Sequence, residues 1–367
     1  MSDDRIVFGP EDVALDRGPL GGFGHDTFVL GAFNPGFTRL PDGRLLLMVR
    51  VAEALREPVW DDAVHAIRWT SGAYVADGWP LGDADRTDPR TFRLKDAVWP
   101  SLGLTSLSWL LPVVLSADGA RVEDVLYDRA IAPNSSGERY GIEDARVARV
   151  EGTYVMTACT VSDERHGTSL WTSKDGLDWT PHGLVLDHQN KDMVIFEGRL
   201  GTSYLAQTRP LGDLYFAPPP GDGHAAGPAI HLATSPDLDH WKPWPRPGLR
   251  PLPGAARMGG GAPPVLTERG WLSLYHAVRD GGDVGIYETY AALLDTDDPS
   301  VVRYRDETQP VLSPRDDLTD RYGDARYLRG VVFTTGLVRE AGGWLVASGE
   351  ADLACRLTRL PEDALPG

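Results

Sequence analysis

The chain has 367 residues, 42% of them hydrophobic, and a formal net charge of -17 at pH 7. This charge argues against nucleic acid and anionic membranes as partners, because both attract basic surfaces. No apolar run reaches the ~20 residues of a membrane span, and the acidic stretch Met1 to Asp12 lacks the basic and apolar order of a secretory signal. The two cysteines, Cys159 and Cys355, are too few for a disulfide framework, so a reducing cytoplasm is the expected compartment.

Five segments have the pattern of a β-hairpin, with an apolar strand, a tight polar or glycine turn and a second apolar strand. They are Arg39 to Arg50, Ala148 to Thr160, Glu197 to Arg209, Pro264 to His276 and Gly336 to Asp352. Their turns fall at Asp42-Gly43, Glu151-Gly152, Leu200-Gly201, Arg269-Gly270 and Gly342-Gly343, which are typical hairpin loops. Five such units predict an all-β fold, a five-bladed β-propeller whose blades meet at one axis. No linker divides the chain, so residues 1–367 are expected to form a single domain.

The segments between the hairpins are less regular. Glu53 to Leu104 reads as a long irregular stretch, and Val51 to Leu104 has no assigned role. Thr105 to Val114 is apolar enough for a buried strand. Two segments, Thr172 to Trp179 and Thr234 to Trp241, share the pattern Thr-Ser-x-Asp-x-x-x-Trp. This pattern predicts a strand that ends in a self-capped turn, followed by a Trp that packs between neighbouring blades. Helix is expected to be scarce, because few windows hold apolar residues at helical spacing without a Gly or Pro.

The most specific chemical signal is the segment Tyr140 to Val147, in which Glu143 and Asp144 precede Arg146. At the entry to a strand, adjacent carboxylates point to opposite faces, so one of them can face the axis. Burial in a closed pocket raises the pKa of a carboxyl group, which suits a general acid near neutral pH. The alternative is a solvated Glu-Asp turn in which Arg146 is a surface ion-pair partner.

From Asn34 onward the chain resembles glycoside hydrolase family 130. The segments that carry the resemblance are Phe33 to Gly36 with Leu47 to Arg50, Gly141 to Arg146, Lys191 to Phe196, Thr208 to Pro210, Met258 to Pro264, Gly270 to His276, Leu293 to Asp295 with Asp298-Pro299, and Val331 to Phe333 near Gly336. Members of this family are five-bladed β-propellers that act on β-mannosides, mostly as inverting phosphorylases. The resemblance therefore implies a β-mannoside phosphorylase that uses inorganic phosphate and releases α-mannose 1-phosphate.

The resemblance also implies roles for single residues on the sugar side of the site. The family's proton donor falls on Asp144, although Ala145 stands where the family usually has Pro. This acid is thought to reach the glycosidic oxygen through the 3-hydroxyl of the sugar. The residues implied for substrate binding are Asn34, Arg50, Tyr140, Glu143 and Asp352.

Phosphate binding requires several cations or N–H donors on one face of the anomeric carbon. Lys191 and Arg209 match the two basic positions of the family's phosphorylases, with Arg257 and His276 as expected neighbours and Tyr215 as a weaker candidate. No cofactor other than phosphate as co-substrate is implied, and the remaining His residues show no paired spacing for a metal.

Two other functions stay open in the sequence. An inverting β-mannosidase would need a carboxylate roughly 6.5 to 9.5 Å from the acid to activate water, and Glu197 is the candidate because Glu197-Gly198 departs from the family pattern. A sugar-binding propeller without catalytic activity is the remaining alternative. The sequence indicates neither the linkage nor the acceptor sugar, and a homo-oligomer is left open.

Overall fold

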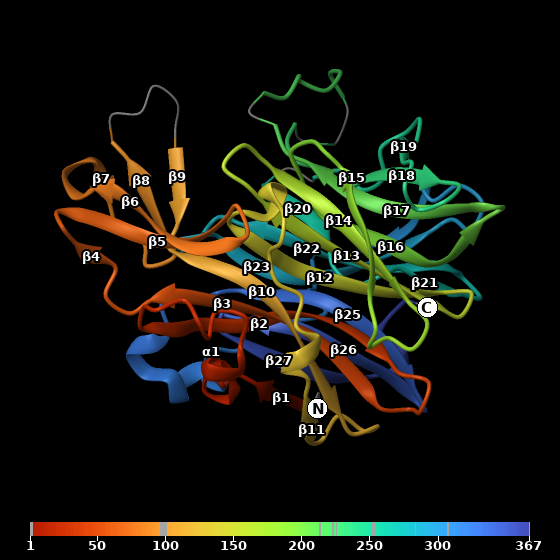
Figure 1. Cartoon of the computed structure of the whole chain (residues 1–367). Coiled ribbons are helices and arrows are strands. Elements are labelled where there is room, and N and C mark those ends of the chain that lie inside the picture. The colour runs from red at the N-terminus through yellow and green to blue at the C-terminus, as the bar shows by residue number, and fades with distance from the viewer. Residues whose placement is uncertain are drawn as a thin grey trace.

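The computed structural model describes residues 3–366, except 96–100, 213, 222–223, 225, 252–253, 283 and 307. In the described residues the strands are β1 (Asp3–Phe8), β2 (Thr27–Arg39), β3 (Leu45–Leu55), β4 (Val59–Trp60), β5 (Ala63–Thr70), β6 (Ala73–Pro80), β7 (Ala84–Asp85), β8 (Thr91–Leu94), β9 (Ser101–Leu104), β10 (Ser106–Leu115), β11 (Val122–Val125), β12 (Gly141–Val150), β13 (Thr153–Val161), β14 (His166–Ser173), β15 (Thr180–Leu186), β16 (Asn190–Leu200), β17 (Ser203–Pro210), β18 (His231–Ser235), β19 (Lys242–Pro243), β20 (Ala255–Gly260), β21 (Val265–Thr267), β22 (Gly270–Arg279), β23 (Ile286–Leu294), β24 (Val302–Arg305), β25 (Val332–Glu340), β26 (Gly343–Glu350) and β27 (Ala354–Pro361). Helix is confined there to the four-residue α1 (Asp316–Thr319) and to short 3-10 turns. The fold is therefore all-β (Figure 1).

All five predicted hairpins are confirmed. Strand pairs β2–β3, β12–β13, β16–β17, β21–β22 and β25–β26 are antiparallel. Their innermost partners are Arg39 with Leu45, Val150 with Thr153, Leu200 with Ser203, Thr267 with Gly270, and Glu340 with Gly343. Gly43, Gly152, Gly201 and Gly342 all have positive φ in these connections, which only glycine adopts freely. The local turn chemistry thus fixes where each hairpin reverses.

Further antiparallel strands extend each hairpin. β10 and β11 continue from β3, β14 and β15 from β13, β18 and β19 from β17, β23 and β24 from β22, and β27 and β1 from β26. The predicted buried strand near Thr105 is confirmed as β10, whose residues are all buried. Strand β1 pairs with β27, so the first strand of the chain lies beside the last one (Figure 1).

The segment Val51 to Leu104 is more regular than its sequence suggests, apart from residues 96–100, which lie outside the described residues. After β3 it forms two small sheets, β4-β5-β6 and β7-β8-β9, which we call the arm. The arm extends from the main body at the left of Figure 1. Its longer hairpin is fully paired from Ala63 with Pro80 to Thr70 with Ala73. The expectation of an irregular stretch was wrong, because short half-buried strands carry little apolar signal.

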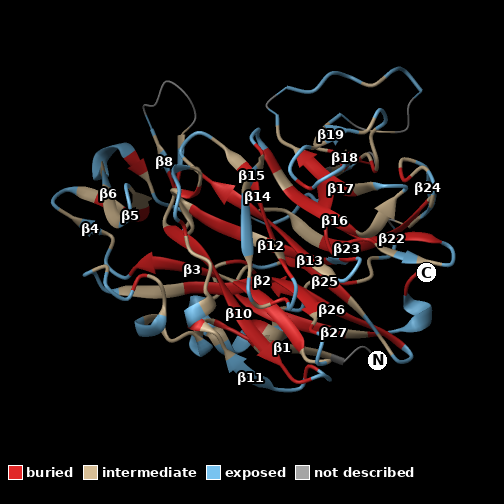
Figure 2. Cartoon of the chain, turned by 45° about the vertical axis from the view of Figure 1, so that its right-hand side comes forward, coloured by how far each residue is buried: buried red, intermediate tan, exposed pale blue. Residues whose placement is uncertain are grey.

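Burial is concentrated in the main sheets, where the strands near the middle of the molecule are buried along most of their length (Figure 2). Trp109, Trp271 and Trp344 are among the largest fully buried side chains. Trp179 and Trp241 lie at the edges of two core clusters, and each cluster draws residues from two consecutive hairpins. Their predicted packing between neighbouring units is therefore confirmed. Within the described chain, no helix is long and apolar enough to cross a membrane.

The turns before these two tryptophans are capped by their own side chains. Ser173 accepts a hydrogen bond from the backbone N–H of Gly176, and Asp175 accepts those of Leu177 and Asp178. The Ser235 and Asp237 side chains accept equivalent bonds in the second copy. The shared sequence pattern therefore corresponds to a shared local structure.

Candidate active site

Three strands carry a β-bulge at the same relative place, and each bulge holds a polar residue. The strand register shifts between Phe33 and Gly36 in β2, between Glu143 and Arg146 in β12, and between Lys191 and Val194 in β16. Asn34, Asp144 and Asp192 occupy these positions with φ values of 45°, 52° and 54°. Asn and Asp tolerate this left-handed conformation better than other side chains. Because a bulge redirects a side chain, strands of three different hairpins can present polar groups to one place.

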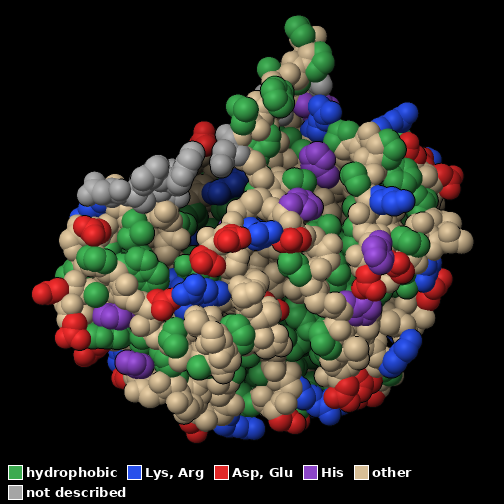
Figure 3. Space-filling model, turned by 45° about the horizontal axis from the view of Figure 1, so that its top comes forward, with side chains coloured by type: hydrophobic (Ala, Val, Ile, Leu, Met, Phe, Trp, Pro, Cys, Tyr) green, Lys and Arg blue, Asp and Glu red, His purple; other side chains and the backbone are tan. Residues whose placement is uncertain are grey.

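A pocket of about 360 Å³ lies where these strands meet, and we call it the axial pocket. It is lined by Asn34, Arg50, Arg90, Leu102, Asp144, Lys191, Asp192, Arg209, Arg257, Val284, Tyr287, Val331, Phe333 and Asp352. Seven residues named from the sequence are in this set: Asn34, Arg50, Asp144, Lys191, Arg209, Arg257 and Asp352. Figure 3 shows acidic and basic side chains gathered around a hollow on the end of the molecule toward which the arm extends.

The two adjacent carboxylates are joined by one guanidinium. Arg50 donates from Nη2 to Glu143 Oε1 at 2.8 Å and from Nη1 to Asp144 Oδ1 at 2.9 Å. Asn34 Nδ2 donates to the same Asp144 oxygen at 2.9 Å, and Lys191 Nζ lies 3.3 Å from Glu143 Oε2. Glu143 is buried behind the pocket surface. A solvated Glu-Asp turn is therefore excluded.

The pKa of Asp144 is shifted opposite to the direction expected from its burial. Burial alone raises the pKa of this carboxyl group, but the charges of Arg50, Lys191 and Arg146 outweigh it and hold the pKa well below its usual value. Asp352 differs, because burial raises its pKa despite Arg50 and Arg90. The expectation that Asp144 has a raised pKa was wrong, since three cations surround the carboxylate.

A second buried cluster forms around Asp192. Its carboxylate lies 3.0 Å from Arg209 Nε, 3.8 Å from Arg146 Nη2 and 3.7 Å from His276 Nε2. Arg146 is therefore a buried partner of Asp192 and not a surface residue. A side chain on Gly259 would overlap the Asp192 carboxylate and the His276 ring, so this glycine makes room for the pair.

The basic residues of the pocket differ in charge and in pairing. Burial lowers the pKa of His276 to about 3, so this residue is neutral near pH 7. Arg257 donates to the backbone carbonyl of Val284 at 2.6 Å and lies over the Tyr287 ring at 5.4 Å. Among the described residues, Arg257 has no carboxylate partner. Of the pocket cations with described surroundings, Arg257 is thus the one most available to an incoming anion.

Five residues named from the sequence do not line the axial pocket. Glu143 and His276 are buried against the lining residues Lys191 and Asp192, whereas Tyr140, Tyr215 and Glu197 lie elsewhere. Tyr140 packs its ring under the Arg68 guanidinium at 3.9 Å. Tyr215 is 38% exposed on a loop, where its hydroxyl accepts a hydrogen bond from the Gly212 N–H. Glu197 accepts a bond from the Arg149 N–H at 3.1 Å.

Arg149 is five residues beyond Asp144, close to the turn of the second hairpin. At about 3.3 Å per strand residue, Glu197 is held well away from Asp144. The structure therefore does not place Tyr140, Tyr215 or Glu197 among the lining residues of the axial pocket.

Several lining residues were not named as site residues from the sequence. Asp192 follows Lys191 in a segment that carries the family resemblance, so its position was a usable signal. Phe333 also lies in a segment that carries the resemblance, whereas Arg90 belongs to the arm, which had no assignment, and nothing in the sequence singled out Tyr287. No group of three or more His, Cys, Asp and Glu residues suited to a metal ion occurs in the part of the chain that the structure describes.

The known proteins that this chain resembles include phosphorylases of mannosides. Residues 115–365 match the model of glycoside hydrolase family 130, described as beta-1,4-mannooligosaccharide phosphorylase. The chain is 33% identical to a beta-1,2-mannobiose phosphorylase of Listeria innocua over 96% of this chain and 94% of that protein. It is 31% identical to a 1,2-beta-oligomannan phosphorylase of Thermoanaerobacter sp. over 62% of this chain and 70% of that protein.

Among solved structures, the Listeria innocua beta-1,2-mannobiose phosphorylase in complex with beta-1,2-mannobiose is similar to this chain. The TM-score is 0.80 at 29% sequence identity, and the match covers 98% of this chain and 97% of the other.

Proposed function

Because the chain belongs to glycoside hydrolase family 130, we propose that it is an inverting phosphorylase that cleaves β-mannosides with inorganic phosphate and releases α-mannose 1-phosphate. One observation carries this proposal. A carboxylic acid, Asp144, shares a pocket with the cations Lys191, Arg209 and Arg257. An acid for the leaving group and cations for a nucleophilic anion are the two requirements of the reaction.

In this mechanism the mannosyl ring lies between Asp144 and the cations. An oxygen of HPO₄²⁻ bonds to the anomeric carbon while the bond from that carbon to the leaving-group oxygen breaks. The leaving oxygen takes the Asp144 proton through the sugar's 3-hydroxyl, and the proton of the attacking phosphate restores the acid. Attack opposite to the leaving group inverts the β-linkage and gives the α-phosphate.

Phosphate binding would also help to protonate the acid. The charge of Lys191 is one of the causes that lower the pKa of Asp144. A phosphate dianion beside Lys191 would offset this charge and raise the pKa of Asp144 again. Proton transfer is therefore expected from the ternary complex, with sugar and phosphate both bound.

The proposed substrates are β-1,2-linked mannosides, because the relatives from Listeria innocua and Thermoanaerobacter carry that linkage in their names. Hydrolysis is not favoured. Glu197, the candidate base, accepts a hydrogen bond from the Arg149 N–H and does not line the pocket. A protein that only binds sugar would have no use for a proton donor facing several cations.

The proposed architecture is a single domain of five four-stranded blades. β2 contacts β12 and β25, β12 contacts β16, β16 contacts β20 and β21, and β23 contacts β25. This order supports a closed ring, in which β1 completes the last blade beside β27. The proposed compartment is the cytoplasm, which suits the two buried, unpaired cysteines.

The test is to incubate the purified protein with β-1,2-mannobiose, with and without phosphate. The expected product is α-mannose 1-phosphate, detected by ³¹P NMR, and it should form only with phosphate. Release of free mannose at the same rate in both conditions would identify a hydrolase instead. The β-1,4-linked isomer in a parallel reaction tests the linkage.

A further inference from the structure

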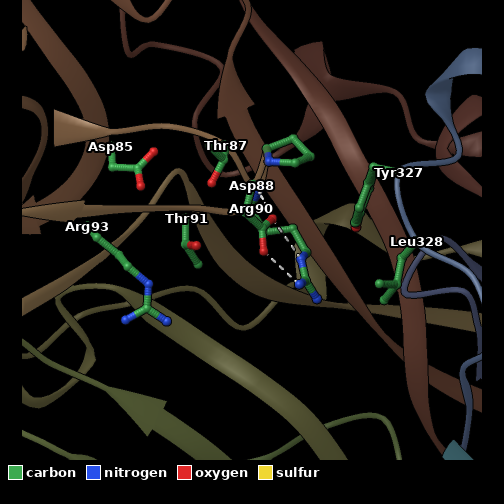
Figure 4. A pocket seen from close by; sticks show the side chains of 9 residues that line it. Asp85, Thr87, Asp88, Arg90, Thr91, Arg93, Tyr327 and Leu328 are labelled. Carbon is green, nitrogen blue, oxygen red and sulfur yellow. Dashed lines mark hydrogen bonds and ion pairs between the residues drawn. The ribbon is translucent and has the colours of Figure 1, made fainter. Parts of the chain in front are cut away.

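A second pocket, of about 420 Å³, lies next to the axial pocket at the base of the arm. Its polar lining includes Asp85, Thr87, Asp88, Arg90, Thr91 and Arg93 (Figure 4). Figure 4 shows Asp85, Thr91 and Arg93 at one end of this arm pocket and Tyr327 and Leu328 at the other. Its volume is within the range of ~300 to 1,000 Å³ that is usual for small-molecule sites.

Arg90 connects the two pockets, because it lines both of them. Its guanidinium donates to both oxygens of Asp88, at 3.0 and 2.8 Å, and its Nη1 lies 3.5 Å from Asp352 Oδ2. Asp352 is close enough to Asp144 and Arg50 for their charges to affect its pKa. The arm pocket therefore joins the axial pocket on the side of the proposed acid.

The acid's side is where a leaving group must lie. Asp144 delivers a proton to the oxygen of the departing saccharide, while phosphate attacks from the opposite face of the anomeric carbon. Sugar units attached to the departing saccharide would then extend past Asp352 and Arg90. Their path leads into the arm pocket.

The charge of the arm pocket suits a neutral ligand with many hydroxyl groups. Two carboxylates, Asp85 and Asp88, balance the two guanidinium groups of Arg90 and Arg93, and Thr87 and Thr91 add hydroxyls. The side chains of Asp85 and Arg93 have no hydrogen-bond or ion-pair partner among the described residues, although their backbones pair in the sheet. The pocket therefore offers both acceptors and donors without net charge, and sugar hydroxyls need both.

We propose that the arm pocket binds the leaving-group sugars of longer β-mannosides, so that chains of three or more units are better substrates than the disaccharide. This inference rests on the proposed function and specifies its substrate class. Arg93 is the decisive residue. It is exposed and has no partner to lose among the described residues, so its removal should not disturb the fold.

The experiment compares the wild type with Arg93→Ala and with the control Arg86→Ala, which removes an exposed arginine directly after β7 that does not line the pocket. Each protein receives phosphate and either β-1,2-mannobiose or β-1,2-mannotetraose, and kcat/KM is measured from mannose 1-phosphate release. Arg93→Ala should lose about tenfold with the tetraose, as expected for one hydrogen bond to a charged group, and less than twofold with mannobiose. Arg86→Ala should match the wild type with both substrates. Equal losses on both substrates, or no loss on the tetraose, would overturn the proposal.

A binding measurement separates this inference from the proposed function. If the wild type forms no mannose 1-phosphate from either substrate, the phosphorylase proposal fails, and the arm pocket is judged by calorimetric titration with β-1,2-mannotetraose. An approximately tenfold weaker Kd in Arg93→Ala than in the wild type supports the pocket. The same Kd in both proteins refutes it.

Discussion

Individual carboxylates pair with the cations of the axial pocket and hold them in place. Glu143 pairs with Lys191, Asp192 pairs with Arg209, and Arg50 spans Glu143 and Asp144. The cations are thus held in place before an anion arrives. Such preorganisation reduces the cost of ordering side chains when the ligand binds.

Replacing Asp144 should separate catalysis from binding. Asp144→Asn keeps a polar side chain of the same shape beside Asn34 and Arg50 but removes the transferable proton. We expect kcat to fall by about 10² to 10⁴, the usual contribution of a general acid, while the KM for the mannoside changes little. Initial rates of mannose 1-phosphate release measure both quantities. Retention of most of the activity would rule out Asp144 as the acid.

Asp192 is expected to act as a positioning residue for the phosphate site. Asp192→Asn leaves Arg146 and Arg209 buried without their counter-charge, which should cost about 3 to 5 kcal/mol of unfolding free energy. The KM for phosphate should rise by tenfold or more, because Arg209 and His276 lose their common partner, while the KM for the mannoside changes less. Urea unfolding and initial rates at varied phosphate measure these effects.

The matched control is Asp187→Asn, which breaks an exposed pair with Arg165 and should alter neither quantity by much. An equal rise in both KM values would indicate general damage instead of a specific role for Asp192 at phosphate.

At the scale of the strand, Glu197 in β16 gives a pH-dependent prediction. Burial raises the pKa of Glu197 to about 7, whereas an unfolded Glu titrates near 4.3. The folded state therefore holds this proton more tightly, so the residue favours folding most below about pH 4. Its contribution declines as the pH rises toward 7 and above. The residue opposes folding once it is charged.

Glu197→Gln removes this penalty, and its amide oxygen can still accept the Arg149 N–H. From pH 5 to pH 8 the stability of the variant relative to the wild type should increase by about 2 to 3 kcal/mol of unfolding free energy, measured by urea unfolding at both values. Its turnover should stay within twofold of the wild type at pH 7. Loss of turnover would restore Glu197 as a candidate base.

The hairpins could be predicted from the sequence and the bulges could not. A hairpin turn is encoded by a few adjacent residues, as in Asp42-Gly43, and the apolar residues on both sides of the turn also indicate a hairpin. The left-handed backbone at Asn34, Asp144 and Asp192 has no such marker, because Asn and Asp also occur in ordinary turns and at the surface. These bulges aim the polar side chains at the pocket, so the detailed geometry of the site became visible only in three dimensions.

The candidate site was found mainly through the family resemblance. A match between positions in two sequences does not show where a side chain lies in space, and the residues that were misplaced or missed follow from this. Position in the chain identified Arg50, Lys191, Arg209 and Arg257, because they lie within or next to segments that match. It could not show that β16 carries Glu197 beyond the pocket. Nor could it identify Arg90, since the arm had no match.

At the scale of the molecule, the two ends of the chain are joined by a buried polar network. Asp4 in β1 accepts hydrogen bonds from Arg356 and Thr358 in β27, and Arg356 also pairs with Glu350. Arg356 and Glu350 are both almost completely buried. The first strand is thus held by charge as well as by backbone pairing.

Removing the Asp4 carboxylate should therefore loosen the whole fold. Asp4→Ala leaves Arg356 with less counter-charge in a buried place, which should cost about 3 to 5 kcal/mol of unfolding free energy. The control Asp26→Ala breaks an exposed pair with Arg56 and should cost no more than about 1 kcal/mol. Urea unfolding of the three proteins makes the comparison, and equal midpoints would show that β1 contributes little to closure.

The pairing of each carboxylate with a cation also affects how firmly the product is held. A sugar phosphate must compete with Glu143 for Lys191 and with Asp192 for Arg209. The pocket should therefore bind the sugar phosphate with only moderate affinity, and the product can dissociate. The same entrance admits it again from solution. Where sugar phosphate is plentiful and free phosphate scarce, the enzyme should run backwards and build mannosides instead of degrading them.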